Sequence, residues 1–400
     1  MKVLLLAPQP FYQLRGTPIA VKRLAEAFSR KGWRVDILTF HEGSDVQIPN
    51  VRVFRIPRIP GARGVRPGFS LKKLLCDMAL SVKAVRITRH AQYDLVHAVE
   101  ESAFIALLIK WATGCPYTYD MDSCLSEQMT DSHPGLKPLL PILQGLEGFV
   151  IRKAHAVLAV CDALRDYACS KGARHAMVLP DAPLCAPPIH GAPRGKIGGG
   201  SANQISLMYI GNLEKYQGID LLLDGFSRFA RSDSNSSLEI IGGNPEHVTY
   251  YREVCRIKKI GDRVHFRGEQ PPERLGAFMA EADVLVSPRT QGVNTPMKIY
   301  SYLQAGQPIL ATDMPAHSQV LSPDFSLLVP PEPEAFARAM ARLASDAPLR
   351  ANLGARALHV ARTRYSPEDF DRTAFAFCDL AERRLVENGY LKPALDTSPQ

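Results

Sequence analysis

Short apolar segments alternate with longer stretches of helical periodicity along most of this chain, and this alternation restricts the fold more than any other feature. The first apolar segment, 3–6, is typical of a buried strand, and the stretch 18–31 behind it has its apolar residues at helical spacing. Further strands are predicted at 35–40, 94–98, 117–119 and 155–160, with an apolar helix at 102–111. This order predicts a parallel sheet with helices on both of its faces.

The alternation stops once and then starts again. Residues 184–203 contain three prolines and a run of three glycines, which is the composition of a linker. Beyond them, strands are predicted at 206–210, 238–242, 264–266, 284–287, 308–311 and 327–329, with helices at 218–231 and 367–388 among those between and after them. We therefore expect an α/β protein with two doubly wound parallel-sheet domains, because 400 residues are too many for one ordinary core. The expected parts are a domain at 1–183, a linker at 184–203, a second domain at 204–365, and a terminal helix and tail at 366–400.

Two loops of the predicted sheets have the same chemistry. The first strand is followed by Arg15–Gly16–Thr17–Pro18, and the strand 284–287 is followed by Asn294–Thr295–Pro296–Met297–Lys298. In each loop the threonine suits the N-cap and the proline suits the first helical position. Ligands bind at the carboxyl ends of such strands, and the free amides of a helix start favour phosphate.

Lys298 stands in the first turn of the second of these predicted helices. A cation there opposes the helix dipole and costs stability unless an anion lies nearby. Arg289 adds a second cation in the same loop. We expect a diphosphate ligand to contact Lys298 and the amides near Thr295, whereas the alternative is a lysine that points into solvent.

Several common motifs are absent from the sequence. It has no G-x-G-x-x-G, no G-x-x-x-x-G-K-[ST] and no G-x-S-x-G, so dehydrogenase, P-loop and hydrolase functions lack their fingerprints. Its eight cysteines form no C-x-x-C pair, and we expect reduced, mostly buried thiols and no structural metal.

The segment 284–312 reads VLVSPRTQGVNTPMKIYSYLQAGQPILAT and resembles the donor-binding segment of glycosyltransferase family 4. The resemblance extends to 209–223 (YIGNLEKYQGIDLLL), to 239–243, to 265–268 and to the N-terminal strand, loop and helix that contain Gly16, so it covers nearly the whole chain. It implies the GT-B architecture, in which two Rossmann-like domains face each other across a cleft. It also implies a retaining, metal-independent transfer from a nucleotide sugar, which is a substrate, so that no cofactor is expected.

The resemblance assigns roles to particular positions. Gly16 would let the backbone approach the donor phosphate, and Lys298 would bind the diphosphate and stabilise the leaving nucleotide. The stretch 266–268 would hold the edge of the base, and the terminal helix would pack against the N-terminal domain. The expected donor-binding residues are Gly16, Thr17, Gly211, Asn212, Lys215, Arg267, Gly268, Arg289, Asn294, Thr295, Pro296, Lys298 and Ser301.

The sequence also departs from the family pattern. Many members carry two glutamates eight positions apart around the helix of Lys298, and here these positions are Val293 and Ser301. Many members place an arginine and a lysine near the first strand of the donor domain. Here Asn212 and Gln217 take their places, with Lys215 as a candidate substitute. An inactive homologue therefore remains one of the alternatives.

In the N-terminal domain, Met121 stands where the family has a histidine, between Asp120 and Asp122. One of these carboxylates would accept a proton from the acceptor hydroxyl or bind the sugar, and capping of the following helix by Asp122 is an equal alternative. His97, Asp120 and Asp122 are the expected catalytic residues, although a packed histidine is just as ordinary at 97. His317 is a further candidate for the cleft.

The whole chain has a net charge of +8, and its positive charge is concentrated in one segment. The segment 51–90 has a single acid, Asp77, against the cations Arg52, Arg55, Arg58, Arg63, Arg66, Lys72, Lys73, Lys83, Arg86 and Arg89. Such a block suits an anionic membrane surface or a lipid-linked acceptor, and nucleic acid is not expected because no recognition motif accompanies it. No apolar run approaches the roughly 20 residues of a membrane span, and no signal peptide is evident. We expect a cytoplasmic protein, peripheral at the inner face of the membrane.

Three functions follow from these observations. The first is transfer of a sugar to a lipid-linked acceptor or a cell-envelope glycan precursor. The second is a nucleotide-sugar epimerase or a phosphorylase of the same architecture, and the third is a non-catalytic sugar-nucleotide-binding protein. Conversion of donor without any acceptor would indicate the epimerase.

Overall fold

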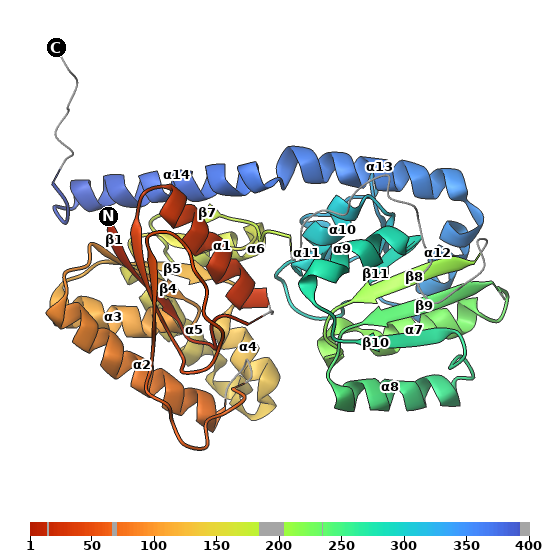
Figure 1. The fold of residues 1–400 in the computed structure, drawn as a ribbon, viewed down its shortest axis with the longest axis horizontal. Helices are drawn as coiled ribbons and strands as arrows, with labels where there is room; N and C mark the ends of the chain where they lie inside the picture. Colours follow the sequence, from red (N-terminus) through yellow and green to blue (C-terminus); the bar gives the residue numbers. More distant parts are fainter. Residues whose placement is uncertain (14–15, 66–69, 184–203, 234, 393–400) are drawn as a thin grey trace, which may run out of the picture. The chain divides into compact units, whose positions relative to one another are not determined.

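The computed structural model describes residues 1–13, 16–65, 70–183, 204–233 and 235–392, which form two compact units (Figure 1). The first unit comprises Met1–Pro180 and Pro367–Gln400, and the second comprises Asp181–Ser366. The linker expected at 184–203 lies outside the described residues, as does Arg15.

The first unit is built on a seven-stranded sheet with the order β3-β2-β1-β4-β5-β6-β7. All of its neighbouring strands pair in parallel. The strands are β1 (Lys2–Ala7), β2 (Arg34–Thr39), β3 (Val51–Arg55), β4 (Leu95–Val99), β5 (Tyr117–Met121), β6 (Val157–Ala159) and β7 (Ala176–Val178). The sequence predicted five of these strands, and it missed β3 and β7.

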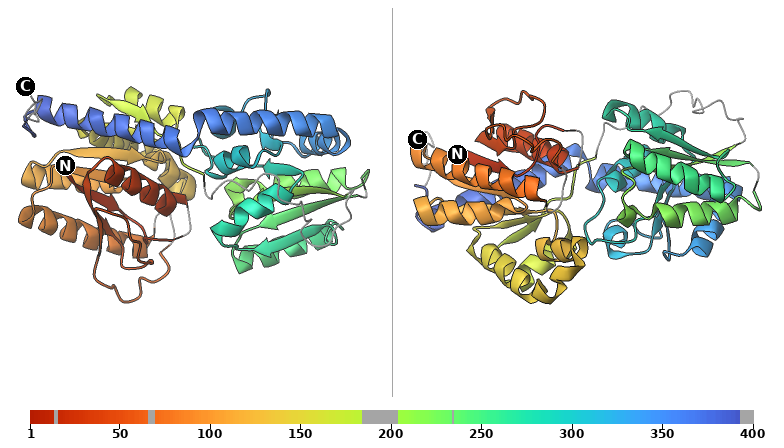
Figure 2. Two further views of the ribbon diagram at one scale, coloured as in Figure 1. Left: turned by 45° about the horizontal axis from the view of Figure 1, so that its top comes forward. Right: turned by 90° about the horizontal axis from the view of Figure 1, so that it is seen from below.

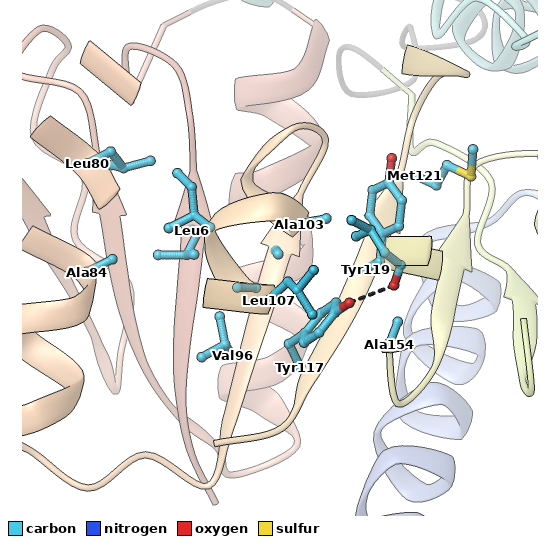
Figure 3. Packing of buried hydrophobic residues seen from close by; sticks show 14 of the residues in the cluster. Leu6, Leu80, Ala84, Val96, Ala103, Leu107, Tyr117, Tyr119, Met121 and Ala154 are labelled. Carbon is cyan, nitrogen blue, oxygen red and sulfur yellow. Dashed lines mark hydrogen bonds between the residues drawn. The ribbon is translucent and has the colours of Figure 1, made fainter. Parts of the chain in front are cut away.

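Helices cover both faces of this sheet. The helices of the unit are α1 (Gly16–Arg30), α2 (Leu71–His90), α3 (Ser102–Thr113), α4 (Leu125–Ser132), the 3-10 helix η1 (Pro134–Leu139), α5 (Leu140–Lys153), α6 (Asp162–Ser170) and α14 (Pro367–Glu387). Alternate strand residues such as Leu6 and Val96 pack under α2, α3, α5 and α6 (Figure 3). Their neighbours, such as Leu5, pack with Phe28 of α1 and Phe377 of α14 on the opposite face.

The second unit repeats the plan with a six-stranded parallel sheet in the order β10-β9-β8-β11-β12-β13. Its strands are β8 (Ile205–Ile210), β9 (Ser236–Ile241), β10 (Val264–Gly268), β11 (Val284–Ser287), β12 (Ile309–Thr312) and β13 (Leu327–Val329). All six had been predicted from the sequence. Its helices are η2 (Lys215–Gln217), α7 (Ile219–Phe229), α8 (Pro245–Ile257), α9 (Pro272–Glu281), α10 (Lys298–Ala305), α11 (Pro315–Ser318), α12 (Pro333–Ser345) and α13 (Ala347–Arg364).

The order of strands places a topological switch point in each unit. In the second unit, α7, α8 and α12 share one core with the sheet, and α9, α10 and α13 share the other. The chain therefore leaves the neighbouring strands β8 and β11 toward opposite faces, and β1 and β4 hold the equivalent place in the first unit. Ligands of doubly wound sheets bind at this point, beyond the carboxyl ends of the strands.

The two α/β units of the predicted fold are thus confirmed, and Figure 2 shows both from two further sides. Among the described residues, no helix combines the length and the apolar character needed to cross a bilayer.

Candidate functional site

The ammonium group of Lys298 is the centre of the candidate site in the second unit. Lys298 begins α10 directly after the loop that follows β11, and its side chain is only 5% exposed. The Nζ atom donates to Oε1 of Gln217 at 3.0 Å and lies 3.9 Å from the centroid of the Tyr209 ring. Burial, and then the charge of Arg289, lower the pKa of Lys298 well below its usual value. The alternative of a lysine that points into solvent is therefore wrong.

Among the described residues, no carboxylate compensates this buried cation. Within the described ranges, the electrostatic influences on Lys298 are burial and Arg289, and no Asp or Glu forms an ion pair with it. A buried charge without a counter-charge is unfavourable by several kcal/mol in order of magnitude. The protein reduces this cost with one amide oxygen and one aromatic face, and an anionic ligand would remove most of the remainder.

Gly211 makes the approach of this ammonium possible. It follows β8, its φ is +151°, and a Cβ atom placed on it would lie 2.9 Å from Nζ of Lys298 and 2.8 Å from the hydroxyl of Tyr209. Any other residue at this position would push the lysine or the tyrosine aside. The tight backbone and the buried lysine are thus one local structure, assembled from the ends of β8 and β11.

Arg289 is fixed within the loop that follows β11. Its Nε donates to the carbonyl of Gln291 at 2.6 Å, and Nη2 donates to Oδ1 of Asn294 at 2.8 Å. Its guanidinium lies 5.3 Å from the centroid of the Tyr216 ring, and a Cβ at Gly292 would come within 2.5 Å of Nη2. Arg289 therefore shapes the loop and contributes its positive charge to the surroundings of Lys298.

Helix α10 begins later than the sequence suggested. Its N-cap is Met297, so Thr295 is not the cap and Pro296 is not the first helical residue. The reason is a tighter turn in front of the helix, where the amide of Ile299 donates to the carbonyl of Pro296 at 2.9 Å. Thr295 is only 1% exposed, and its hydroxyl has no hydrogen-bond partner in the described part of the chain. A buried hydroxyl without a partner is a place where a ligand atom would be accepted.

Other predicted donor residues have more varied positions. Asn212 and Lys215 are exposed beside Gly211, and Nδ2 of Asn212 donates to the hydroxyl of Tyr216 at 3.2 Å. Ser301 is 2% exposed, one turn into α10. Their proposed contacts with a ligand stay predictions.

In the predicted base-binding strand, Arg267 and Gly268 make contacts within the protein, and in the first unit Thr17 lies further inside its helix than predicted. Nε of Arg267 donates to Oε2 of Glu239 at 2.8 Å, so its guanidinium is engaged in an ion pair. The carbonyl of Gly268 accepts the amide of Gly242 at 2.7 Å. In the first unit, α1 begins at Gly16, which places Thr17 inside the first turn instead of in front of it.

The side chain of His317 is enclosed by the protein. Its side chain is fully buried, and its ring nitrogens contact Oγ of Ser287 and Oγ1 of Thr312, each at 2.9 Å. Burial lowers its pKa to about 4, so the ring is neutral near pH 7. The expectation that it could reach the cleft is wrong, and its role here is to connect β11 with the end of β12.

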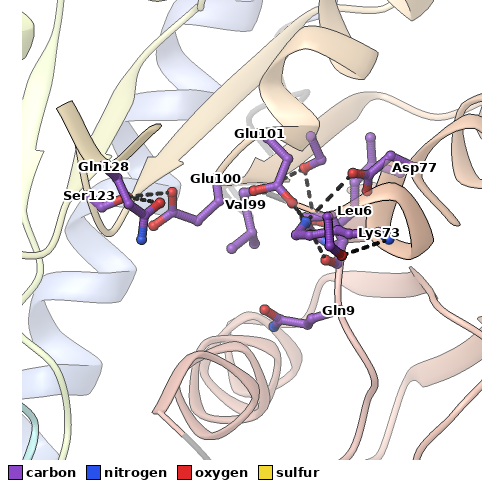
Figure 4. A network of polar contacts seen from close by, with 12 residues as sticks. Leu6, Gln9, Lys73, Asp77, Val99, Glu100, Glu101, Ser123 and Gln128 are labelled. Carbon is purple, nitrogen blue, oxygen red and sulfur yellow. Dashed lines mark hydrogen bonds and ion pairs between the residues drawn. The ribbon is translucent and has the colours of Figure 1, made fainter. Parts of the chain in front are cut away.

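The first unit gathers carboxyl groups where the second gathers cations. Glu100 follows β4, and its Oε2 accepts from the hydroxyl of Ser123 at 2.9 Å (Figure 4). Its amide donates to the carbonyl of Asp120, which lies at the end of the neighbouring strand β5. Burial, together with the charge of Asp120, raises the pKa of Glu100. Glu100 was not among the catalytic residues expected from the sequence.

His97 is a buried partner of Asp120 and cannot contact a substrate directly. It lies within β4, is fully buried, and packs edge-on against Phe28 and Phe377. Its Nδ1 lies 2.9 Å from Oγ1 of Thr118 and its Nε2 lies 3.3 Å from Oδ2 of Asp120. The prediction of a catalytic His97 is corrected accordingly, because alternation along β4 turns it under α1 and α14. It holds Asp120, whose side chain is 15% exposed.

Met121, between the two aspartates, is fully buried in the opposite core, so Asp120 and Met121 face opposite sides of the sheet. Asp122 is half-buried and takes part in an interaction of its own. The side chain of Asp120 contacts His97 of the neighbouring strand β4.

Two family models match the chain, and together they span most of it. A glycosyl transferase 4-like domain matches residues 15–181, and the group 1 glycosyl transferases match residues 204–346. The chain is a glycosyltransferase of family 4.

Similar proteins agree with this assignment. The transferase is 24% identical over 333 residues to a phosphatidyl-myo-inositol mannosyltransferase of Mycobacterium leprae. The matched region covers 80% of this chain and 81% of the relative. Its fold is similar to that of a sucrose-phosphate synthase from Thermosynechococcus elongatus, with a TM-score of 0.78, 17% identity and coverage of 96% and 99% of the two chains. HepE of Anabaena in complex with UDP has a TM-score of 0.72 at 16% identity, with coverage of 95% and 100%. These structures establish the GT-B fold for the transferase.

The basic block of the transferase is not one uniform charged surface. Arg52 pairs with Asp36 and Arg55 pairs with Asp45. Lys73 is largely buried, pairs with Glu101 and lies 3.6 Å from Oδ2 of Asp77 (Figure 4). The cations of the block that the structure describes as exposed without such a pair are Arg58, Arg63, Lys72, Arg86 and Arg89, and Arg66 lies outside the described residues.

Some residues of the site could not be chosen from the sequence. Gln217 was noted only as the place of a missing lysine, and Tyr209 and Tyr216 were not considered. Their signal is weak because their role depends on Lys298 and Arg289, which are far away in the sequence.

Proposed function

We propose that the transferase moves a sugar from a nucleoside-diphosphate sugar to a hydroxyl group of an acceptor. The observation that carries this proposal is the buried ammonium of Lys298, which has a close glycine, an amide oxygen and an aromatic ring around it but no carboxylate from the part of the chain that the structure describes. A diphosphate oxygen would supply the missing negative charge. Related structures of HepE from Anabaena, in complex with UDP and with UDP-glucose, support a donor of this class.

The same residues suit the chemical step. When the bond between the anomeric carbon and the diphosphate oxygen breaks, negative charge grows on the leaving nucleotide. Lys298 lies at the ligand, and Arg289 adds positive charge behind it, so the charge is stabilised as it develops. We propose that these two cations take the part that a metal ion plays in other transferases, and that the configuration of the sugar is retained.

The acceptor side is proposed to be the carboxyl edge of the first sheet. Asp120, held by His97, would accept the proton of the acceptor hydroxyl or bind the sugar that carries it. The mannosyltransferase relative is named for a phosphoinositide, which supports a lipid-linked acceptor or another precursor of the cell envelope.

A thermal-shift panel of UDP-, GDP- and ADP-sugars tests the donor proposal. A ligand of the native state raises the unfolding temperature, so one nucleotide class is expected to stabilise the protein above the others. Lys298→Met should remove this shift, and Lys259→Met, the same change at an exposed lysine of the same unit, should keep it.

The proposal fails if Lys298→Met, still folded, binds the same nucleotide sugar with unchanged affinity. A donor that is converted without acceptor would replace transfer by epimerisation. Activity that EDTA abolishes and Mg²⁺ restores would overturn metal independence, and the anomeric configuration of the product, determined by NMR, tests retention.

A further inference from the structure

Three helices of the first unit expose large apolar side chains in regular lines. On each of α2, α3 and α5, the exposed apolar residues are three or four positions apart in the sequence. This spacing places them on one face of the helix. Each side chain is between 36% and 72% exposed. The members are Leu71, Leu75, Met78 and Val82 on α2, Phe104, Leu108 and Trp111 on α3, and Ile142, Leu146 and Phe149 on α5.

These lines belong to one surface, which we call the three-helix face. Helices α2, α3 and α5 cover the same side of the sheet, and α3 packs against both of the others (Figures 1 and 2). The rings of Trp111 and Phe149 lie 6.3 Å apart and join the lines of α3 and α5. A continuous exposed apolar surface of this kind on a folded domain marks a docking site.

The charges on the three-helix face have one sign. Arg86 and Arg89 continue the line of α2 after Val82, and Lys153 continues the line of α5 after Phe149. The acids of these described helices are not exposed, because Asp77 is paired with Lys73 and Glu147 is 1% exposed. The exposed charged side chains of the face are therefore all basic.

We infer that the three-helix face lies on an anionic phospholipid bilayer. Apolar side chains would enter the boundary of the acyl chains, with Trp111 at the headgroup level, and the cations would meet lipid phosphates. A second copy of the chain fits less well, because the same face of a partner would offer its cations no exposed acid.

The bilayer would also place the acceptor. Helix α3 follows β4 and its exposed line starts at Phe104, four residues after Glu100, so the apolar surface begins beside the carboxyl edge of the sheet. In this last step the inference rests on the proposed function, because it takes the acceptor to be lipid-linked. The binding to lipid can be measured without transfer.

The test is sedimentation of the full chain with vesicles of phosphatidylglycerol and phosphatidylcholine at low salt. Replacing Leu108, Trp111 and Ile142 together by serine should weaken binding at least about tenfold, because these side chains supply the buried apolar area. Ile257→Ser is the matched control, since Ile257 is 67% exposed on α8 of the second unit. Arg86→Gln with Arg89→Gln should reduce the part of the binding that salt screens.

Four results would overturn the inference. In the first, the wild-type chain does not bind anionic vesicles. In the second, the triple variant binds them as tightly as the wild-type chain, and in the third, the wild-type chain binds neutral vesicles as tightly as anionic ones. The fourth is a wild-type chain that is a dimer in light scattering and a triple variant that is a monomer, which would assign the face to a second copy.

A donor thermal shift on the same samples separates the two proposals. A wild-type chain that binds vesicles but shows no thermal shift with donor counts against the proposed function alone. A wild-type chain that shows the thermal shift but does not bind vesicles counts against the membrane face alone.

Discussion

The two units of this protein share one architecture and differ in the charge at the carboxyl ends of their strands. In the second unit, the ends of β8 and β11 surround the buried cation Lys298, and within the described ranges no carboxylate pairs with it. In the first, the ends of β4 and β5 bring Glu100 and Asp120 together, and the nearby Lys73 is already paired with Glu101. The fold therefore fixes where each site lies, and the side chains decide its ligand. An uncompensated cation suits phosphate, and carboxylates suit hydroxyl groups.

Asp120→Asn tests the acceptor side of this comparison and should have the largest effect. The amide keeps the shape of the carboxylate but cannot accept a proton, so kcat should fall about 100-fold while donor affinity stays the same. Steady-state kinetics with the donor and an acceptor extract would measure this. A variant of full activity would contradict the assignment of Asp120 to the acceptor hydroxyl.

Gly211→Ala tests the donor side through packing alone. The new Cβ would displace the lysine ammonium or the Tyr209 ring, and donor affinity should fall about tenfold or more, the cost of one weakened charged hydrogen bond. Gly261→Ala is the control, because a Cβ there meets nothing closer than 3.9 Å. Calorimetric titration of both variants gives the answer, and equal affinities would separate Gly211 from the site.

Proton uptake on donor binding would sharpen the contrast between the two charges. The pKa of Lys298 is lowered in the free protein, and a diphosphate beside it should raise it again. At a pH between the pKa of Lys298 in the free protein and its pKa in the complex, binding of the donor takes up a proton. The affinity should therefore fall as pH rises from the pKa of the free protein to that of the complex, by at most about tenfold per pH unit, and level off above it. Titrations in buffers of different ionisation enthalpy measure the uptake, and a binding enthalpy that does not depend on the buffer would contradict it.

The smallest expected effect concerns the stability of the first unit. The pKa of Glu100 is raised in the folded state, so its contribution is complete below the unfolded value and is lost as pH rises through the folded value. Glu100→Gln should therefore raise the unfolding temperature above neutral pH by up to about 2 °C and change little near pH 4. Glu127→Gln, at an exposed glutamate, should change neither. Equal shifts at both pH values would show that the charge of Glu100 does not matter.

The two strands that were not predicted from the sequence, β3 and β7, show a limit of prediction from apolar patterns. Both β3 and β7 lie at the edges of the first sheet, and neither has a fully buried residue. Central parallel strands are buried on both faces and appear as apolar runs, whereas the edge strand Val51–Arg55 contains two arginines among its apolar residues. Those arginines were interpreted only as part of a basic block.

The site shows a second limit. The sequence placed a cation at a helix start, but it could not tell whether that cation was exposed. The burial of Lys298 depends on Gly211, Tyr209 and Gln217, which come from another strand end. His97 was misjudged for a related reason, because its partners Phe28 and Phe377 come from opposite ends of the chain.

Helix α14 also bears on how this protein is made. Its residues Phe377, Cys378, Ala381 and Leu385 are fully buried in the core of the first unit, although nearly the whole chain separates them from β1. The ribosome delivers the second unit as one continuous stretch, and it delivers α14 only after that whole unit. One face of the first unit's sheet therefore stays partly uncovered until the second unit has been synthesised.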